Sequence, residues 1–372
     1  MDSPVALGSS RLPSFLLLVL ALGTAVAAQE SPRLSASPIR DGCAPPGAAC
    51  VDPSEPRQAA SYEVLPANLG PGGFLVFPQT RVAANGVSLR DVASGGIDLV
   101  GVPPGSTVVA AYLYWCWISL GAPVPGLHDV LSIARLPRLP GHNLQGPLQG
   151  YLLRPRPFTG VLVGSGVDPC WNGGGNYVYR ADVTALVTKG DSYVVWPEPG
   201  AAGANDYRDP WAFPFPNGPY CEGASLVVVY TNPGEIAGTT YLYDSGLAGN
   251  MFLASPGTFY TLTGFLHPGS EARWINIGAD GQSGAGYQDL HSMGLETTWF
   301  NGLPVAGPGS LADSDWNGAG NKPLALMWDT SGHDVSAFLS PGATSAGIQV
   351  AAPAPTSVTD CLVPVCNVLW VR

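Results

Sequence analysis

The segment 171–176, Trp-Asn-Gly-Gly-Gly-Asn, returns as Trp-Asn-Gly-Ala-Gly-Asn at residues 316–321. A second motif follows each copy: Asp-Val-Thr-Ala-Leu-Val-Thr-Lys-Gly at 182–190 and Asp-Val-Ser-Ala-Phe-Leu-Ser-Pro-Gly at 334–342. The Asp and the hydroxyl residue can cap a single turn, and the Gly then releases the chain into the next strand. Two motifs that recur in one order predict an internal duplication, in which each turn crosses over the end of a β-sandwich.

The sequence around these motifs favours strands. From residue 62 onward, apolar and β-branched runs such as 107–115 and 224–230 recur between turn signals, and no window of helical length shows a clean apolar face. The 48 Gly and 37 Pro residues suit short strands joined by tight turns. Asn-Gly, which favours the positive φ angles of hairpins, occurs at Asn85, Asn172, Asn217, Asn301 and Asn317. We predict an all-β protein of two tandem β-sandwich, jelly-roll-like units.

The amino terminus predicts export. Residues 1–28 carry a positive charge at Arg11, an apolar run that begins at Phe15, and the small residues 25–28 before Gln29. This is the pattern of a cleaved secretory signal peptide. The stretch from Phe15 to Ala28 is shorter than the roughly 20 residues that cross a bilayer, so a membrane anchor is disfavoured. No later stretch is long and apolar enough to span a membrane, and we expect a secreted or extracellular product.

The mature chain divides into three parts. Residues 29–60 are rich in Pro, Ser, Ala and Arg without an apolar period, which predicts a mobile leader. The first β-sandwich unit is expected at 61–205 and the second at 206–372, with a boundary in the Pro-rich stretch 197–219.

Charge excludes one class of partner. Charged residues make up 12% of the chain, the net charge is −11, and only two lysines occur. A nucleic-acid-binding protein needs a basic surface, so we expect no nucleic-acid role.

Seven cysteines suit an exported, disulfide-bearing protein. Proximity in sequence predicts the pairs Cys43–Cys50 and Cys361–Cys366, and leaves one further bridge and one free thiol among the other three. Zinc is the alternative, but no Cys-x-x-Cys pair exists and no histidine lies beside a cysteine.

One segment resembles the start of a calcium-binding loop. Asp313, Asp315 and Asn317 alternate as in Asp-x-Asp-x-Asn-Gly, which brings oxygen ligands onto one ion. The twelfth position, where an EF-hand has Glu, is Leu324, and the first repeat has Cys170 where the second has Asp315. The segment is therefore either a structural calcium site in the second unit or a polar turn that caps backbone N–H groups.

Aromatic residues near the repeated loops suggest ligand contacts. Exposed rings such as Trp171 and Trp316 can stack on sugars while Asn172 bonds the hydroxyls. The alternative is that these rings are sandwich core.

No catalytic constellation is complete. The sequence has neither a Gly-x-Ser-x-Gly elbow nor a His-Glu-x-x-His helix. The Gly-rich segment 281–286 is flanked by Asp280, Asp289 and His291. These residues either line a pocket or, as we favour, lie on the surface of a loop. A carboxylate pair for glycoside cleavage stays open, because its separation is spatial.

Several blocks resemble a known family. Residues 223–233 with 241–244, residues 179–184, and residues 326–330 leading to 334–336 are similar to a family of uncharacterised exported proteins from GC-rich bacteria. The likeness covers about residues 75–370. It implies an exported, β-rich surface or matrix protein and no activity.

The sequence thus predicts a secreted, non-catalytic protein that binds a glycan or another cell-surface component, with structural calcium as the candidate cofactor. An exported hydrolase of polysaccharides is the alternative.

Overall fold

The computed structural model describes residues 65–66, 74–90, 94–119, 121–136, 154–167, 174–187, 190–198, 219–245, 251–253, 257–282, 296–307, 315–316, 326–352 and 361–372. These residues form strands joined by turns, with one 3-10 turn, η1 (Ser336–Phe338), and no α-helix. Among them, therefore, no helix could cross a membrane. The described strands all belong to one compact unit, residues 61–372. The predicted all-β class is confirmed.

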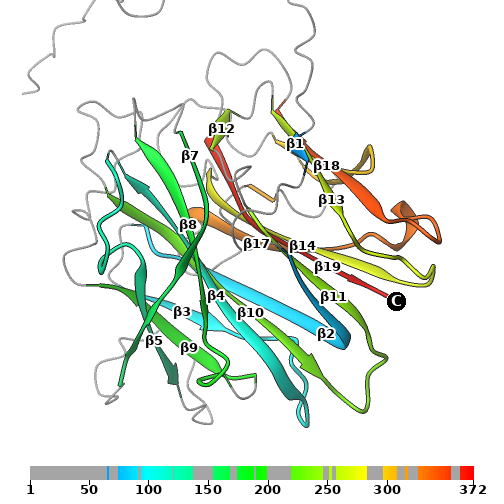
Figure 1. The fold of residues 1–372 in the computed structure, drawn as a ribbon, viewed down its shortest axis with the longest axis horizontal. Helices are drawn as coiled ribbons and strands as arrows, with labels where there is room; N and C mark the ends of the chain where they lie inside the picture. The colour runs from blue at the N-terminus through cyan, green and yellow to red at the C-terminus, as the bar shows by residue number, and fades with distance from the viewer. Residues whose placement is uncertain are drawn as a thin grey trace, which may run out of the picture. The chain divides into compact units, whose positions relative to one another are not determined.

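The strands form one large and two small sheets (Figure 1). The large sheet has the order β17 (Leu326–Asp334), β14 (Ala272–Gln282), β19 (Cys361–Val371), β11 (Gly238–Asp244), β2 (Phe74–Ser88), β10 (Tyr220–Thr231), β4 (Thr107–Ser119), β8 (Gly175–Asp182) and β7 (Val161–Val167), with β12 (Phe252–Leu253) paired to β19. One small sheet has the order β3 (Gly95–Asp98), β9 (Ser192–Pro197), β5 (Val130–Leu136), β6 (Arg156–Thr159). The other has the order β1 (Leu65–Pro66), β13 (Thr258–Thr263), β18 (Ser345–Ala351), β15 (Thr297–Phe300), β16 (Leu303–Ala306).

The same strand order occurs twice. In the large sheet, β2-β10-β4-β8 corresponds to β11-β19-β14-β17, and the small sheets correspond as β3-β9-β5-β6 and β13-β18-β15-β16. Each set of eight strands has the connectivity of a jelly roll. We call strands β2–β10 the first jelly roll and β11–β19 the second; they are joined by the antiparallel pairing of β2 with β11.

The repeated order differs from the predicted unit boundary. The strand order divides the chain between β10 and β11, whereas the boundary expected at residues 205–206 lies outside the described residues. The strand β10, expected in the second unit, is hydrogen-bonded between β2 and β4 of the first. Duplication as the origin of the two jelly rolls stays a prediction.

The crossover turn predicted from the repeated motif is present in both jelly rolls. In the first, the Asp182 carboxylate accepts the Thr184 N–H at 2.9 Å, and the Thr184 hydroxyl accepts the Ala111 N–H at 2.9 Å. The same two contacts recur in the second jelly roll, both at 3.0 Å, between Asp334, Ser336 and Ala272. This turn is the link that carries the chain from the large sheet to the small one.

Of the Asn-Gly turns, one is confirmed. Asn301 and Gly302 have φ angles of 50° and 78° and form the hairpin between β15 and β16. Asn85-Gly86 lies instead inside β2, where the pairing of residues 81–88 with β10 overrides the local turn preference. The other three Asn-Gly steps lie outside the described residues.

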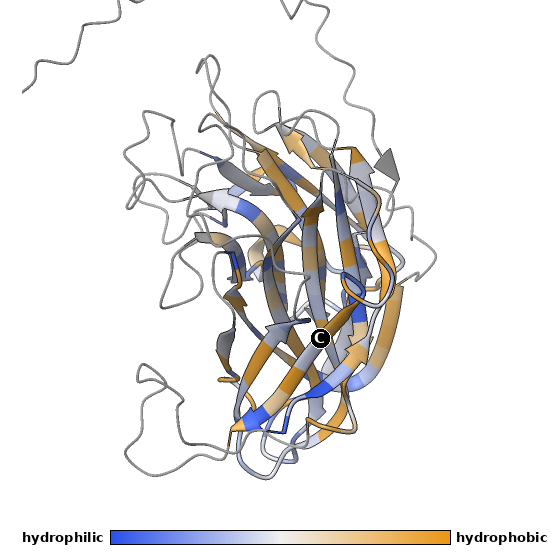
Figure 2. Ribbon diagram, turned by 90° about the vertical axis from the view of Figure 1, so that its left-hand side faces the viewer, coloured by the Kyte–Doolittle hydropathy of each residue, from blue (hydrophilic) through white to orange (hydrophobic). Residues whose placement is uncertain are grey.

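Hydrophobic side chains form three main clusters. One lies between the two sheets of the first jelly roll around Trp115, and one between the two sheets of the second around Trp274. The third contains residues of both jelly rolls, such as Val229 of β10 and Ile277 of β14. Orange hydrophobic segments recur along the strands in Figure 2. The two jelly rolls therefore share a core.

The predicted Cys361–Cys366 disulfide is wrong. Cys366 is a free, buried thiol, whereas Cys361 is itself disulfide-bonded. Both residues lie on β19, where five residues at about 3.3 Å each place them far beyond the separation that a disulfide spans. Cys43 and Cys50 lie outside the described residues. Cys116 and Cys221 are also free and buried.

Candidate functional site

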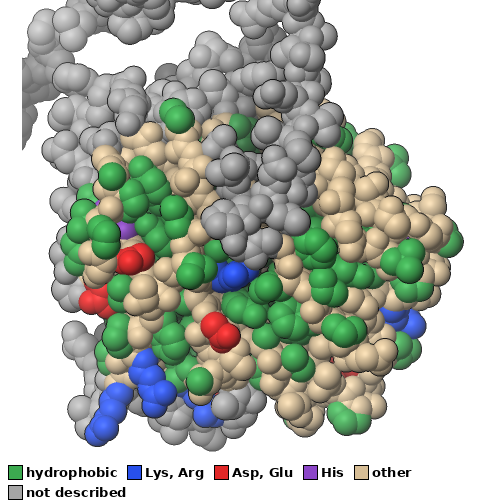
Figure 3. Space-filling model, viewed as in Figure 1, with side chains coloured by type: hydrophobic (Ala, Val, Ile, Leu, Met, Phe, Trp, Pro, Cys, Tyr) green, Lys and Arg blue, Asp and Glu red, His purple; other side chains and the backbone are tan. Residues whose placement is uncertain are grey.

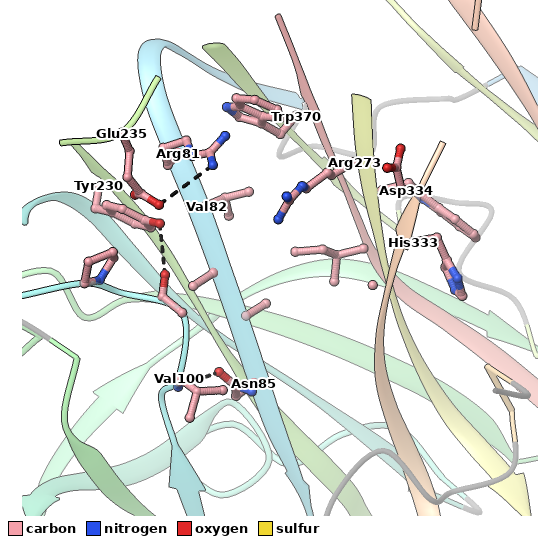
Figure 4. Close-up of a pocket in the computed structure, with 17 residues that line it drawn as sticks. Arg81, Val82, Asn85, Val100, Tyr230, Glu235, Arg273, His333, Asp334 and Trp370 are labelled. Carbon is pink, nitrogen blue, oxygen red and sulfur yellow. Dashed lines mark hydrogen bonds and ion pairs between the residues drawn. The ribbon is translucent and has the colours of Figure 1, made fainter. Parts of the chain in front are cut away.

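A groove of about 610 Å³ opens where the two jelly rolls meet (Figure 4). Residues 81–85 of β2 supply one wall, together with Val100, Gly101 and Pro103 after β3 and with Tyr230 and Glu235. Residues 273–275 of β14 and 332–334 of β17 supply the other, and Trp370 of β19 completes the lining. Its volume lies within the range of small-ligand sites, which often form at such interfaces.

An irregularity in β2 positions the first wall. Residues 74–80 of β2 pair with β11, and residues 81–88 pair with β10. At the change of partner, Gln79 has a φ of 59° and the register against β11 shifts between Gly238 and Thr240. A bulge of this kind bends a strand and redirects its side chains, and Arg81 follows directly.

Arg81 is held in place by two contacts. Its guanidinium lies 4.3 Å from the centre of the Trp370 ring, and its Nη2 lies 3.8 Å from Oε1 of Glu235. The indole N–H of Trp370 in turn donates to the Thr80 carbonyl at 2.8 Å. Arg81 is thus stacked on an immobile ring, an arrangement that suits guanidinium.

Arg273 faces the groove from the second jelly roll. It is exposed on β14, and Figure 4 shows its side chain extending toward β2. Its cross-strand neighbour Asp334 is committed to the crossover turn, because Oδ1 accepts the Ser336 hydroxyl at 2.6 Å and the Ser336 N–H at 3.0 Å. These hydrogen bonds from Ser336 hold the pKa of Asp334 below its usual range. No described carboxylate lies within ion-pair distance of Arg273.

The loop at the far side of the groove is fixed by polar contacts. The Tyr230 hydroxyl donates to the Gly101 carbonyl at 2.9 Å, and the Asn85 amide oxygen accepts the Val100 N–H at 3.0 Å. Burial raises the pKa of Tyr230 to about 12, so this hydroxyl stays protonated at neutral pH. Hydrogen bonds therefore hold the charged, amide and aromatic groups of the groove in fixed positions.

Two of the predicted site residues are described, and both are buried. The Trp316 ring packs against Phe252, with ring centres 6.1 Å apart, and against the backbone of Gly278. The Asp315 carboxylate contacts Nε2 of His333 at 2.7 Å. Neither side chain faces the groove, and Trp316 presents no exposed ring for a sugar.

The remaining predicted site residues, Asp313, Asn317, Trp171 and Asn172, lie outside the described residues. Within the described part of the chain, no three His, Cys, Asp or Glu side chains converge to hold a metal ion. Calcium stays a prediction.

A second polar centre is buried between the jelly rolls. Nη1 of Arg90 donates to both carboxylate oxygens of Glu222, at 2.9 and 3.0 Å, and lies 3.5 Å from Oδ1 of Asp280. The guanidinium also stacks on Tyr220, 4.5 Å from the ring centre. Asp280 lies in β14 and is 1% exposed with a φ of 68°, so the preferred assignment of this residue to a loop is wrong.

No sequence motif marks the residues of either site. Arg81 is the only charged residue of β2, Arg273 shares β14 with Asp280, and Arg90 and Glu222 meet only through the fold. On the face shown in Figure 3, charged side chains are few and stand among hydrophobic and uncharged ones. The single charge of β2, at Arg81, is a local signal that could have identified the groove.

Comparisons with known proteins add no family. No protein-family model matches the chain, and no curated protein matches it. Among solved structures, PNGF-II matches 79% of this chain and 65% of its own at 12% identity, with a TM-score of 0.25. A tandem pair of CBM51 modules, from a family 98 glycoside hydrolase of Streptococcus pneumoniae, matches 77% of this chain and 83% of its own at 8% identity, with a TM-score of 0.19. The Sputnik virophage structure matches 94% of this chain and 91% of its own at 10% identity, with a TM-score of 0.18. At such scores these likenesses carry no argument about function.

Proposed function

We propose that this protein is exported and binds a glycan, without catalysis, in the groove between its two jelly rolls. The observation that carries the proposal is that both jelly rolls contribute polar side chains to one opening of about 610 Å³. Guanidinium, carboxylate and amide groups there can exchange hydrogen bonds with sugar hydroxyls. A ligand held by both walls would also link the two jelly rolls.

The carboxylates in the groove support binding over catalysis. Glu235 is the partner of Arg81, and Asp334 caps the turn at Ser336. The hydrogen bonds from Ser336 lower the pKa of Asp334, which is the opposite of the shift that general acid work requires. Export is supported by the signal-like sequence of residues 1–28.

Filling the groove tests the proposal. Gly332 is exposed and lines the groove, and a Cβ there would meet nothing closer than Ile275 Cγ1 at 3.9 Å, so we expect Gly332→Leu to place a side chain in the groove. Gly121→Leu is the matched control, because no atom lies within 4 Å of a Cβ at that exposed position. On a glycan array, we expect the parent protein and Gly121→Leu to bind the same sugars and Gly332→Leu to lose them. Binding that survives in Gly332→Leu, or no binding by the parent, would overturn the proposal.

The polysaccharide hydrolase is the second candidate, favoured by Glu222 and Asp280 around Arg90. Glycoside cleavage uses a pair of carboxyl groups, and these two lie beside one guanidinium, with Nη1 of Arg90 2.9 Å from Glu222 and 3.5 Å from Asp280. Release of reducing sugar from a polymer panel, lost in Glu222→Gln and retained in Glu235→Gln, would establish this function in place of the binding one.

A further inference from the structure

We infer that the ligand of the groove carries an acidic group, a carboxylate or a sulfate, which Arg273 and Arg81 recognise. This inference rests on the proposed function and specifies its ligand class. Acidic saccharides such as oligouronates have this chemistry.

Arg273 is the first basis of the inference. Its guanidinium is exposed in the groove and has no carboxylate partner among the described residues. The neighbouring Asp334 lowers the local positive charge, but its Oδ1 already accepts two hydrogen bonds from Ser336. The donors of Arg273 are therefore available, and guanidinium binds planar anions through two parallel hydrogen bonds.

Arg81 supplies a second positive charge to the same groove. It faces Arg273 from β2, and its contact with Glu235 is long at 3.8 Å, which leaves donors free for a ligand (Figure 4). Stacking on Trp370 fixes the plane of its guanidinium. Two guanidinium groups that line one groove repel each other, and an anion between them would replace this repulsion with attraction.

The two arginines of the groove stand in an acidic protein. The chain has a net charge of −11 and only 16 Lys and Arg residues. The overall field therefore repels an acidic polymer, and attraction must come from the groove itself. The groove should therefore select ligands whose acidic group lies within reach of Arg81 and Arg273.

A pair of ligands that differ only in the acidic group tests the acidic-ligand inference separately from glycan binding itself. We would measure binding of uronic-acid oligosaccharides, and of the same oligosaccharides reduced to neutral sugars at the carboxyl, by titration calorimetry on the full chain. The variants are Arg273→Gln and, as control, Arg156→Gln, an exposed arginine on β6 that does not line the groove. Melting temperatures would confirm that both variants fold.

We expect the acidic oligosaccharide to bind at least about tenfold more tightly than the neutral one, since charge-assisted hydrogen bonds are about twice as strong as neutral ones. Arg273→Gln should remove this preference, and Arg156→Gln should keep it. Equal binding of the two ligands, unchanged in Arg273→Gln, would overturn the inference and leave the glycan groove intact. No binding of either ligand would overturn the inference together with the proposed function.

Discussion

Nη1 of Arg180 lies 2.8 and 2.6 Å from the two carboxylate oxygens of Asp244 and ties the first jelly roll to the second. Arg180 stands on β8 and Asp244 at the end of β11. The Tyr114 hydroxyl also donates to Asp244, at 2.8 Å. The Asp244 side chain is fully buried, and Arg180 and Tyr114 are the partners that stabilise its charge within the described part of the chain.

Removing the guanidinium should therefore destabilise the protein strongly. We expect Arg180→Met to lower the free energy of unfolding by about 3–5 kcal/mol at pH 7, because it leaves a buried carboxylate without its counter-charge. Urea denaturation measures the loss. The double variant Arg180→Met, Asp244→Asn should recover part of it, and a double variant no more stable than the single one would contradict this account.

The destabilisation caused by Arg180→Met should decrease as the pH falls. Burial raises the pKa of Asp244 above its ordinary value, with Arg180 opposing the rise. A carboxyl with a raised pKa in the folded state binds its proton more tightly there than in the unfolded state, so its contribution to stability falls as pH rises from about 4. Without Arg180, the pKa of Asp244 should rise further. Arg180→Met should therefore lower the free energy of unfolding by less at pH 4.5 than at pH 7. Equal losses at both pH values would argue against a buried charge as the cause.

The interior of the second jelly roll contains an unsatisfied amide. Asn276 is fully buried, and neither atom of its amide has a hydrogen-bond partner among the residues that the structure describes. Counting from the two crossover turns, it occupies the position of Trp115 in the first jelly roll. We expect Asn276→Leu to raise the free energy of unfolding by about 1–2 kcal/mol, since a buried polar group without a partner is costly.

Its neighbour provides the control. Asn367 pairs with Asn276 across the strands, but its oxygen accepts the Trp274 indole N–H at 2.9 Å and the Tyr260 hydroxyl at 3.3 Å. Asn367→Leu should therefore destabilise the protein. Loss of stability in both variants on thermal unfolding would show that the Asn276 amide is hydrogen-bonded and would contradict the prediction.

Close packing between the jelly rolls predicts intolerance at Gly223. A Cβ on this residue of β10 would lie 2.5 Å from the Trp328 ring of β17. Trp328 cannot easily move, because its indole N–H donates to Ser225 at 2.8 Å. We expect Gly223→Ala to cost about 1–3 kcal/mol, the usual range for overpacking, and Gly121→Ala to change stability little. Equal melting temperatures for the two variants would contradict the packing.

The free thiols should report unfolding. Burial raises the pKa of the Cys116, Cys221 and Cys366 thiols, and the thiolate is the reactive form. With iodoacetamide at pH 8, these positions should stay unmodified in the native protein and react once denaturant unfolds it, as mass spectrometry of peptides would show. Rapid labelling of the native protein would mean that these strands open readily.

The sequence predicted the features that local chemistry determines. The Asp-Val-[Ser/Thr] motif alone indicated the crossover turns at Asp182 and Asp334, and Asn301-Gly302 indicated a hairpin. Predictions from local sequence were wrong where long-range strand pairing determines the conformation. Asn85-Gly86 lies inside β2, and Cys361 and Cys366 are held apart by the extended β19.

The site could not be predicted for the same reason. Arg81 and Arg273 are far apart in sequence and come to one groove only because β2 changes partner at Gln79 and the second jelly roll folds beside it. Arg90 and Glu222 likewise meet across neighbouring strands. Neither pair has a spacing that periodicity or a motif can indicate, since the contact belongs to the sheet order.

Hydrogen–deuterium exchange with and without a bound oligosaccharide tests the central claim most directly, because it locates the ligand without any substitution. A glycan in the groove should slow amide exchange in peptides that contain residues 81–85, 273–275 and 332–334, on both walls at once. Protection confined to other segments, with these three unchanged, would contradict the assignment of the groove as the binding site.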